Sequence, residues 1–125
     1  RRTTGIYGKL YVMNGNRFRI YDNGGAKSQR NKWCNAVCVH AIVFVVSLSS
    51  YDEFTWDDPL QNAMTESLHV FGECVNNPYW ENIPFMLFLN KKDIFEQKIK
   101  TTPITVCNSF RHYNGNIQDC YECIE

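Results

Sequence analysis

The chain has 125 residues, which suits one domain at most, and 44% of them are hydrophobic, well above the level of a disordered chain. Lysine plus arginine total 13 and aspartate plus glutamate total 13, so charge gives no argument for a nucleic-acid partner or a membrane surface. No apolar run approaches the length of a bilayer span. The sequence starts at Arg1 without an initiator methionine, and we expect a fragment of a longer protein.

The first predicted element is a β-hairpin. Two alternating runs flank Asn14-Gly15, and this dipeptide favours a tight hairpin turn because both residues accept positive φ. We therefore expect Ile6–Met13 and Arg17–Asp22 to pair antiparallel. After a loop with two glycines, the polar run Lys27–Trp33 is predicted to be helical.

Two apolar runs predict strands of another kind. Ala41–Leu48 and Ile83–Leu89 are continuously apolar, which is typical of strands buried on both faces of a parallel sheet. Between them, an acidic pair and a proline at Asp57-Asp58-Pro59 predict the start of a helix, and Asn76-Asn77-Pro78 predicts its end. Apolar residues recur every three or four positions and give this helix one hydrophobic face. They are Leu60, Met64, Leu68, Phe71 and Val75.

The last part of the chain completes the predicted fold. Asn90-Lys91-Lys92-Asp93 follows the second apolar run, then a short polar helix, then Ile104–Cys107 in or beside a strand. Strands that alternate with helices indicate an α/β fold: one continuous domain with a mostly parallel sheet, flanking helices and one antiparallel hairpin at the sheet edge. In such sheets ligands bind beyond the carboxyl ends of the strands, where Asp22–Gly25 and Asn90–Asp93 both fall.

The sequence Asn90-Lys91-Lys92-Asp93 matches the N-K-x-D pattern of GTPases. Guanine presents two adjacent donors, a ring N–H and an exocyclic amine, and one carboxylate, that of Asp93, can accept both. Such a bidentate, charge-assisted contact is selective because adenine cannot offer the same pair. The stem of Lys91 can cover the face of the base, and Asn90 can tie the loop to its neighbours. By itself, the pattern is also compatible with an ordinary polar turn.

The sequence Asp22-Asn23-Gly24-Gly25 follows the hairpin. In P-loop GTPases an aspartate at this place holds Mg²⁺. A glycine N–H contacts the terminal phosphate, because glycine lets the backbone approach closely. A tight turn is the simpler explanation of the motif alone. Gly25-Ala26-Lys27-Ser28 is not the end of a G-x-x-x-x-G-K-[ST] loop, because Ala26 separates the glycine from the lysine.

Thr3-Thr4-Gly5 is a third element, since a threonine hydroxyl is a suitable hard-oxygen ligand for Mg²⁺. In this order the three elements resemble the alpha subunits of heterotrimeric G proteins. The resemblance continues at Ser47–Asp52, Asn62–Asn77 and Lys98–Lys100, is good to about Cys107 and is weak afterwards.

The resemblance implies a role for each matching residue. Thr3 resembles the switch I ligand of Mg²⁺, and Asp22 and Gly25 resemble the Mg²⁺-linked aspartate and the phosphate-sensing glycine of switch II. Trp33, with Lys27 and Arg30 before it, matches the partner-binding part of switch II. The nucleotide site would comprise Thr3, Asp22, Asn23, Gly24, Gly25, Asn90, Lys91, Lys92 and Asp93, with GTP or GDP as ligand.

The family resemblance also implies partners and a location. These are a beta–gamma dimer, a G protein-coupled receptor, an effector enzyme, and a cytoplasmic position at the inner face of the plasma membrane, with no nucleic acid. The 125 residues would be a partial Ras-like GTPase domain without the phosphate-binding loop, the helical insert and the C-terminal guanine loop. The receptor and the effector stay open.

Several residues differ from the family pattern. Ala26 stands where the family has the glutamine that orients the attacking water, and a methyl group cannot hydrogen-bond to water, so the sequence predicts impaired hydrolysis and no catalytic residue. Asn23 replaces a valine and Lys27 an arginine. Whether the protein is an active enzyme stays open.

Six cysteines raise the question of zinc or disulfides. Cys34-x3-Cys38 and the C-x-x-C of Cys120 and Cys123 could together supply four zinc ligands. Cysteines in helices are more often small core residues, and no signal peptide is visible, so reduced cytosolic thiols are the better interpretation. The role of Cys120 and Cys123 stays open.

Two other functions remain alternatives. A non-catalytic interaction module could use the switch II and helix surface to bind partners without nucleotide. A phosphate-loop kinase or ATPase fragment would require an adenine-compatible site where Asp93 stands.

Overall fold

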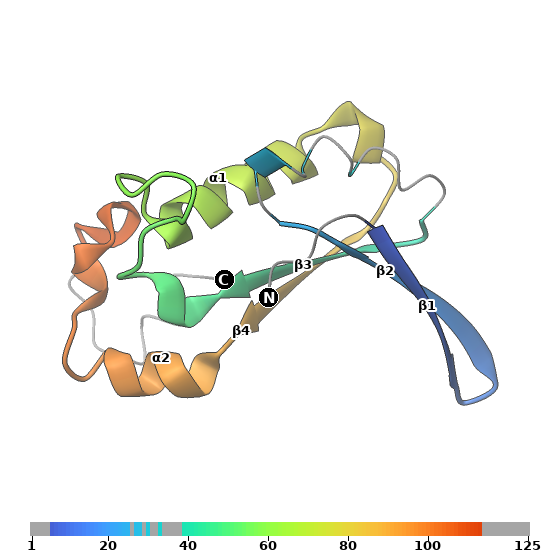
Figure 1. Ribbon diagram of the computed structural model, residues 1–125, viewed down its shortest axis with the longest axis horizontal. Helices are drawn as coiled ribbons and strands as arrows, with labels where there is room; N and C mark the ends of the chain where they lie inside the picture. The colour runs from blue at the N-terminus through green and yellow to red at the C-terminus, as the bar shows by residue number, and fades with distance from the viewer. Residues whose placement is uncertain (1–5, 26, 29, 31–32, 34–38, 114–125) are drawn as a thin grey trace. The chain divides into compact units, whose positions relative to one another are not determined.

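The computed structural model describes residues 6–25, 27–28, 30, 33 and 39–113. The chain forms two compact units, residues 1–39 and 40–125, and each is described by itself (Figure 1). Both helices and strands are present, so the predicted α/β class is confirmed. No helix in the described ranges is long and apolar enough to cross a membrane.

The first unit contains the predicted hairpin. Strands β1 (Ile6–Met13) and β2 (Asn16–Asn23) pair antiparallel as a two-stranded sheet. The turn residues Asn14 and Gly15 have φ of 51° and 78°, the positive values that a two-residue hairpin turn requires. The prediction is therefore confirmed, with β2 one residue longer at each end than expected. In the run predicted to be helical, the described residues Lys27, Ser28, Arg30 and Trp33 lie in 3-10 turns, and the rest lie outside the described residues.

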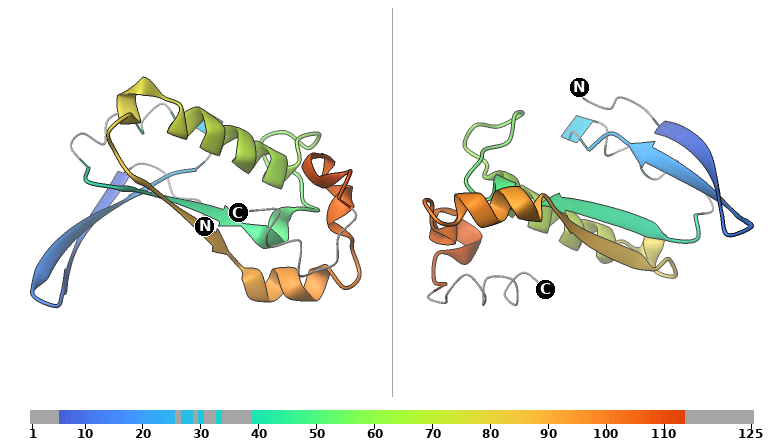
Figure 2. Two further views of the ribbon diagram at one scale, coloured as in Figure 1. Left: turned by 180° about the vertical axis from the view of Figure 1, so that it is seen from behind. Right: turned by 90° about the horizontal axis from the view of Figure 1, so that it is seen from below.

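The second unit contains the predicted parallel pair. Strands β3 (Ile42–Ser47) and β4 (Phe85–Asn90) pair in parallel, with Ile42 opposite Phe85 and Ser47 opposite Asn90 (Figure 2). Both strands begin one or two residues later than predicted. The pairing places the carboxyl ends of both strands at the same edge of the sheet.

Burial of these strands on both faces was predicted, and this is wrong for the described structure. One face contacts helix α1 (Ala63–Val75), where the Phe71 ring lies 5.1 Å from that of Phe44. On the other face, Val43 and Val45 are 52% and 57% exposed, and their register partners on β4 are exposed too. Continuous apolar strands require a helix on each face, and within the described part of this unit α1 covers one face.

The start of α1 differs from the prediction. Asp58 and Pro59 lie in a turn, in which Asp58 Oδ1 accepts from the Leu60 N–H at 2.9 Å, and the Leu60 side chain is 89% exposed. Asn62 caps the helix instead: its Oδ1 accepts from the N–H groups of Met64 and Thr65, both at 3.0 Å. The predicted end at Asn76 is confirmed, because α1 ends at Val75.

A short helix and two 3-10 turns complete the second unit. Helix α2 (Lys92–Lys98) follows β4, as predicted. Ile104–Val106 forms a 3-10 turn, so the expectation of a strand at Ile104–Cys107 is wrong. Both segments add side chains to the core of this unit, which closes around the ends of β3 and α1. The core consists of Val46, Leu48, Tyr51, Met64, Phe95, Ile104 and Cys107.

Candidate functional site

Asn90-Lys91-Lys92-Asp93 forms a sharp corner between β4 and α2. Asn90 is the last residue of the strand, and its Oδ1 accepts from the Lys91 N–H at 2.8 Å. Lys91 has φ 59° and ψ 38°, a left-handed conformation that turns the chain at once into α2. Its carbonyl then accepts the first helical hydrogen bond, from the Phe95 N–H at 3.0 Å. The corner is therefore fixed by its own side-chain and backbone contacts.

The corner presents Asp93 at the edge of the sheet where β3 and β4 both end. Asp93 lies in the first turn of α2 and is exposed. A carboxylate is stabilised there by the free N–H groups of the helix start. Lys92 pairs with Glu96 at 3.8 Å along the same helix, and both side chains are exposed. The structure thus places an exposed carboxylate on a well-defined backbone, an arrangement that can accept two hydrogen bonds from a planar ligand.

The carboxyl end of α2 is held by an ion-pair cluster that the sequence did not predict. Lys98 Nζ donates to the Ser49 carbonyl at 2.8 Å, to Asp52 Oδ1, and to Glu53 Oε1 at 3.2 Å. The hydrogen bond to Asp52 is the largest cause of a raised Lys98 pKa, with Glu53 acting in the same direction and partial burial opposing both. Lys98 is therefore a cation at neutral pH.

The turn Asp22–Gly25 lies in the other unit, where β2 ends at Asn23. Asp22 is exposed, Gly24 is buried and Gly25 is exposed, with no described heavy atom within 4 Å of a Cβ built on Gly25. A ligand could therefore approach the backbone of Gly25 closely. The Oδ1 atom of Asn23 is buried and has no hydrogen-bond partner among the described residues. Burying an unpaired amide oxygen is unfavourable.

The predicted partner-binding residues contact this same turn. The Trp33 indole Nε1 donates to the Gly24 carbonyl at 3.1 Å, and Trp33 is partly buried. Arg30 Nε donates to the Gly25 carbonyl at 3.4 Å. Lys27 is exposed. Arg30 and Trp33 thus hydrogen-bond to the carbonyl groups of the glycine turn, while Lys27 is exposed to solvent.

The other predictions fall outside the described residues. These are Thr3, the predicted second Mg²⁺ ligand, Ala26, and the paired cysteines. Among the residues that the structure describes, no three His, Cys, Asp or Glu side chains could hold a metal ion together. Mg²⁺ bound beside a nucleotide needs only one or two protein ligands, with phosphate and water completing its shell, and the exposed carboxylate of Asp22 fits that chemistry. Of the cysteines, Cys107 is fully buried in the core and Cys74 is half-buried in α1.

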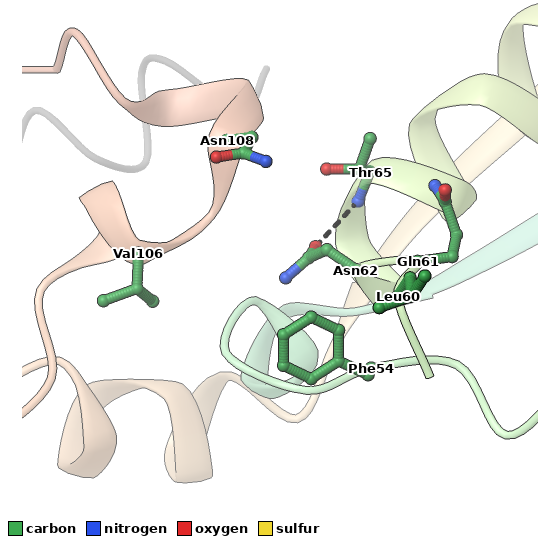
Figure 3. Close-up of a pocket in the computed structure, with 7 residues that line it drawn as sticks. All are labelled: Phe54, Leu60, Gln61, Asn62, Thr65, Val106 and Asn108. Carbon is green, nitrogen blue, oxygen red and sulfur yellow. Dashed lines mark hydrogen bonds between the residues drawn. The ribbon is translucent and has the colours of Figure 1, made fainter. Parts of the chain in front are cut away.

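One cavity of about 280 Å³ lies away from the predicted residues (Figure 3). It opens between the start of α1 and the two 3-10 turns near Val106 and Asn108. Asn62 and Thr65 line it, but the Asn62 amide already caps α1 and donates to the Tyr51 carbonyl at 2.7 Å. The Asn62 amide is thus engaged within the protein, and we assign the cavity no ligand.

Sequence reasoning missed Lys98, Asp52 and Asn62. Lys98 contacts residues more than forty positions away, and a pattern of charges in the sequence does not specify such a contact. Asn62 had a detectable signal, because an asparagine followed by an acidic residue in the first turn of the helix, here Glu66, is typical of a helix start. The acidic pair Asp57-Asp58 with Pro59 was the stronger signal, and it led to a predicted start of α1 that is too early.

Comparison with known proteins identifies the family. The family model for the G-protein alpha subunit matches residues 1–125. The guanine nucleotide-binding protein alpha-7 subunit of Caenorhabditis elegans is 45% identical over 124 residues, which cover 98% of this chain and 34% of that protein. The G(o) subunit alpha of the same organism is 41% identical over 122 residues, 97% of this chain and 34% of that protein.

A relative from a distant organism agrees. The guanine nucleotide-binding protein alpha-4 subunit of Dictyostelium discoideum is 43% identical over 115 residues, which cover 91% of this chain and 33% of that protein. The chain thus spans about a third of the length of these relatives. The match includes both strand-end turns described above. The chain belongs to the G-protein alpha subunit family.

Proposed function

We propose that this chain is part of a signal transducer that alternates between GTP-bound and GDP-bound states. The 125 residues would form part of a Ras-like domain with the phosphate-loop GTPase fold, which the full-length protein completes. The carrying observation is the corner at Asn90–Asp93, which presents an exposed carboxylate at the carboxyl edge of a parallel sheet. That is the edge where α/β folds bind their ligands.

Guanine is the base that best suits this corner. Its ring N–H and exocyclic amine are adjacent donors, and both can reach one Asp93 carboxylate. Lys91 and Lys92 would lie beside the base and the sugar, and Asn90 would keep the corner in shape through the hydrogen bond to the Lys91 N–H. Adenine presents an acceptor next to its amine, which a carboxylate repels.

The phosphates and Mg²⁺ would meet the other turn. Asp22 would hold Mg²⁺ together with Thr3, while the backbone of Asn23, Gly24 and Gly25 would lie near the terminal phosphate. When bound, the ion neutralises charge on the phosphate oxygens. The open space beside Gly25 supports this placement. Lys27, Arg30 and Trp33 would belong to the surface that changes partners when the phosphate is lost.

The partners follow from membership of the family. They would be a beta–gamma dimer, a G protein-coupled receptor and an effector enzyme, met at the cytoplasmic face of the plasma membrane. Ala26 makes slow hydrolysis part of the proposal, because its methyl side chain cannot orient water. An interaction module that binds partners without nucleotide is the alternative. The buried Asn23 Oδ1, which has no hydrogen-bond partner among the described residues, favours it.

A nucleotide competition tests the proposal. The full-length protein is titrated with a fluorescent GDP analogue in the presence of Mg²⁺, and the probe is displaced with GDP or ADP. We expect displacement by GDP at concentrations at least 100-fold lower than by ADP, since ADP would leave the Asp93 carboxylate unpaired. Absence of binding with and without Mg²⁺ would contradict the proposal and favour the interaction module.

A further inference from the structure

Helix α2 connects the proposed base site at its start to an ion-pair cluster at its end. Its first turn contains Asp93, and its last residue is Lys98. With seven residues, the helix is only about 10 Å long, at about 1.5 Å of rise per residue. A helix this short has few contacts of its own, so its orientation depends on what holds each end.

At its start, α2 is held by the Asn90–Lys91 corner described above. In its middle, Phe95 is fully buried and meets the Tyr51 ring edge-on, with 5.5 Å between ring centroids. The Tyr51 hydroxyl donates to the Thr102 carbonyl at 2.6 Å, just beyond the helix. These contacts attach α2 to the core, and Ile99, directly after the helix, packs against the same core.

At the far end, the Lys98 side chain crosses from α2 to the segment after β3. Its ammonium group contacts three residues of the segment after β3: Ser49, Asp52 and Glu53. The Lys98 and Asp52 side chains are 28% and 22% exposed, so solvent screens their attraction only in part. Lys98 Nζ also lies 5.8 Å from the centre of the Tyr51 ring.

We propose that Lys98 is a positioning residue for guanine recognition. Its contacts with Ser49, Asp52 and Glu53 set the tilt of α2 and thereby the direction of the Asp93 carboxylate. This inference depends on the proposed function, because it assigns Lys98 a part in base selection at the same site.

The physical reason is the directionality of a bidentate contact. Asp93 lies near the corner at Lys91, so a tilt of α2 moves its carboxylate little but turns it by the full angle. Two parallel hydrogen bonds from a rigid base tolerate only about 10–20° of misorientation. When the Asp93 carboxylate turns, the hydrogen bond that it accepts from the exocyclic amine becomes weaker.

The preference for GDP over IDP is a readout that a merely structural role of Lys98 would not change. Inosine lacks the exocyclic amine of guanine, whereas IDP and GDP have the same sugar and phosphates. The ratio of their dissociation constants therefore reports the contact of Asp93 with the amine. General loss of stability lowers the binding of both nucleotides equally and leaves the ratio unchanged.

The experiment measures GDP and IDP affinity in the full-length protein and in the Lys98→Met variant. Methionine keeps the length and apolar stem of lysine and removes its charge. We expect the preference for GDP over IDP to fall about 3- to 30-fold. Lys100→Met is the matched control, because Lys100 is an exposed lysine two residues further on, and we expect the wild-type ratio there. An unchanged ratio in folded Lys98→Met would overturn the inference.

Two further variants keep the outcomes distinct. Asp93→Asn tests the proposed function itself: if the preference for GDP persists in that variant, Asp93 does not contact the amine and the base site is wrong. If Asp93→Asn abolishes the preference and Lys98→Met does not, only the positioning role is refuted.

Should Lys98→Met fail to fold, Glu53→Gln removes one contact of Lys98 and keeps the other two. We expect about a twofold loss of preference there, and an unchanged ratio would overturn the inference.

Discussion

The two strand-end turns differ in how well their residues suit a ligand. At Asn90–Asp93 the family pattern is intact, and the backbone is held by the Asn90 side chain. At Asp22–Gly25 the glycines are retained, but Asn23 buries an amide oxygen without a partner among the described residues. Ala26 stands next to this turn in the sequence.

The difference distinguishes nucleotide selection, proposed for Asn90–Asp93, from GTP hydrolysis, proposed for the region of Asp22–Gly25. Under the proposed function, base selection would need a shaped corner and one carboxylate, which Asn90–Asp93 supplies. Hydrolysis would need a side chain that orients water, and the side chain of Ala26 is a methyl group. We therefore propose that nucleotide selection is kept while hydrolysis is slow, and the two turns can be tested independently.

The largest expected effect is the absence of nucleotide binding in the isolated 125-residue chain, which contains both turns. The 125 residues contain no G-x-x-x-x-G-K-[ST] sequence, which supplies most of the phosphate contacts in this fold. We expect no measurable binding of a fluorescent GTP analogue to the purified 125-residue chain in a fluorescence titration. Micromolar, Mg²⁺-dependent binding would show that the two turns suffice without that loop.

The next effect concerns hydrolysis. In the full-length protein, Ala26→Gln restores a side chain that can orient water and should raise single-turnover hydrolysis by roughly one to several orders of magnitude. Phosphate release from preloaded GTP measures the rate, with GDP affinity as the control that should not change. Equal rates in both proteins would mean that the differences at Asn23 and Lys27 have already dismantled the site, and the interaction module would gain support.

A smaller effect is expected from Asn23→Val. Valine removes the buried oxygen, which has no partner among the described residues, and favours the strand, so the full-length protein should gain about 1–2 kcal/mol of unfolding free energy. Urea unfolding of nucleotide-free protein measures it, and Asn16→Val at the exposed start of β2 is a control on the same strand. A loss of stability would mean that the Asn23 oxygen has a favourable contact in the full-length protein.

Much of the fold could be predicted because local signals specified it. Asn14-Gly15 determined the hairpin, since few other residues accept the observed positive φ at both positions. The apolar runs at β3 and β4 indicated a parallel pair, and the register of Ser47 with Asn90 brings the second turn to the sheet edge, as expected. Burial on both faces failed as a prediction because it depends on how many elements cover the sheet, which a single strand does not encode.

The candidate site was predictable only in part, for a similar reason. The corner residues were found from their order after a strand. The cluster around Lys98 depends on tertiary contacts, and no local pattern indicates it. The start of α1 was misplaced because Asp58 and Pro59 suit both a helix start and the turn that they form, and the packing of Asn62 against Tyr51 decides between the two.

The most direct test of the account is the base preference of Asp93→Asn in the full-length protein. An asparagine amide donates where the carboxylate accepted, so it suits the carbonyl that xanthine has in place of the exocyclic amine of guanine. We expect the preference in competition between GDP and XDP to shift toward XDP by about 100-fold or more. An unchanged preference for GDP would contradict the central claim, because it would show that Asp93 does not contact the base.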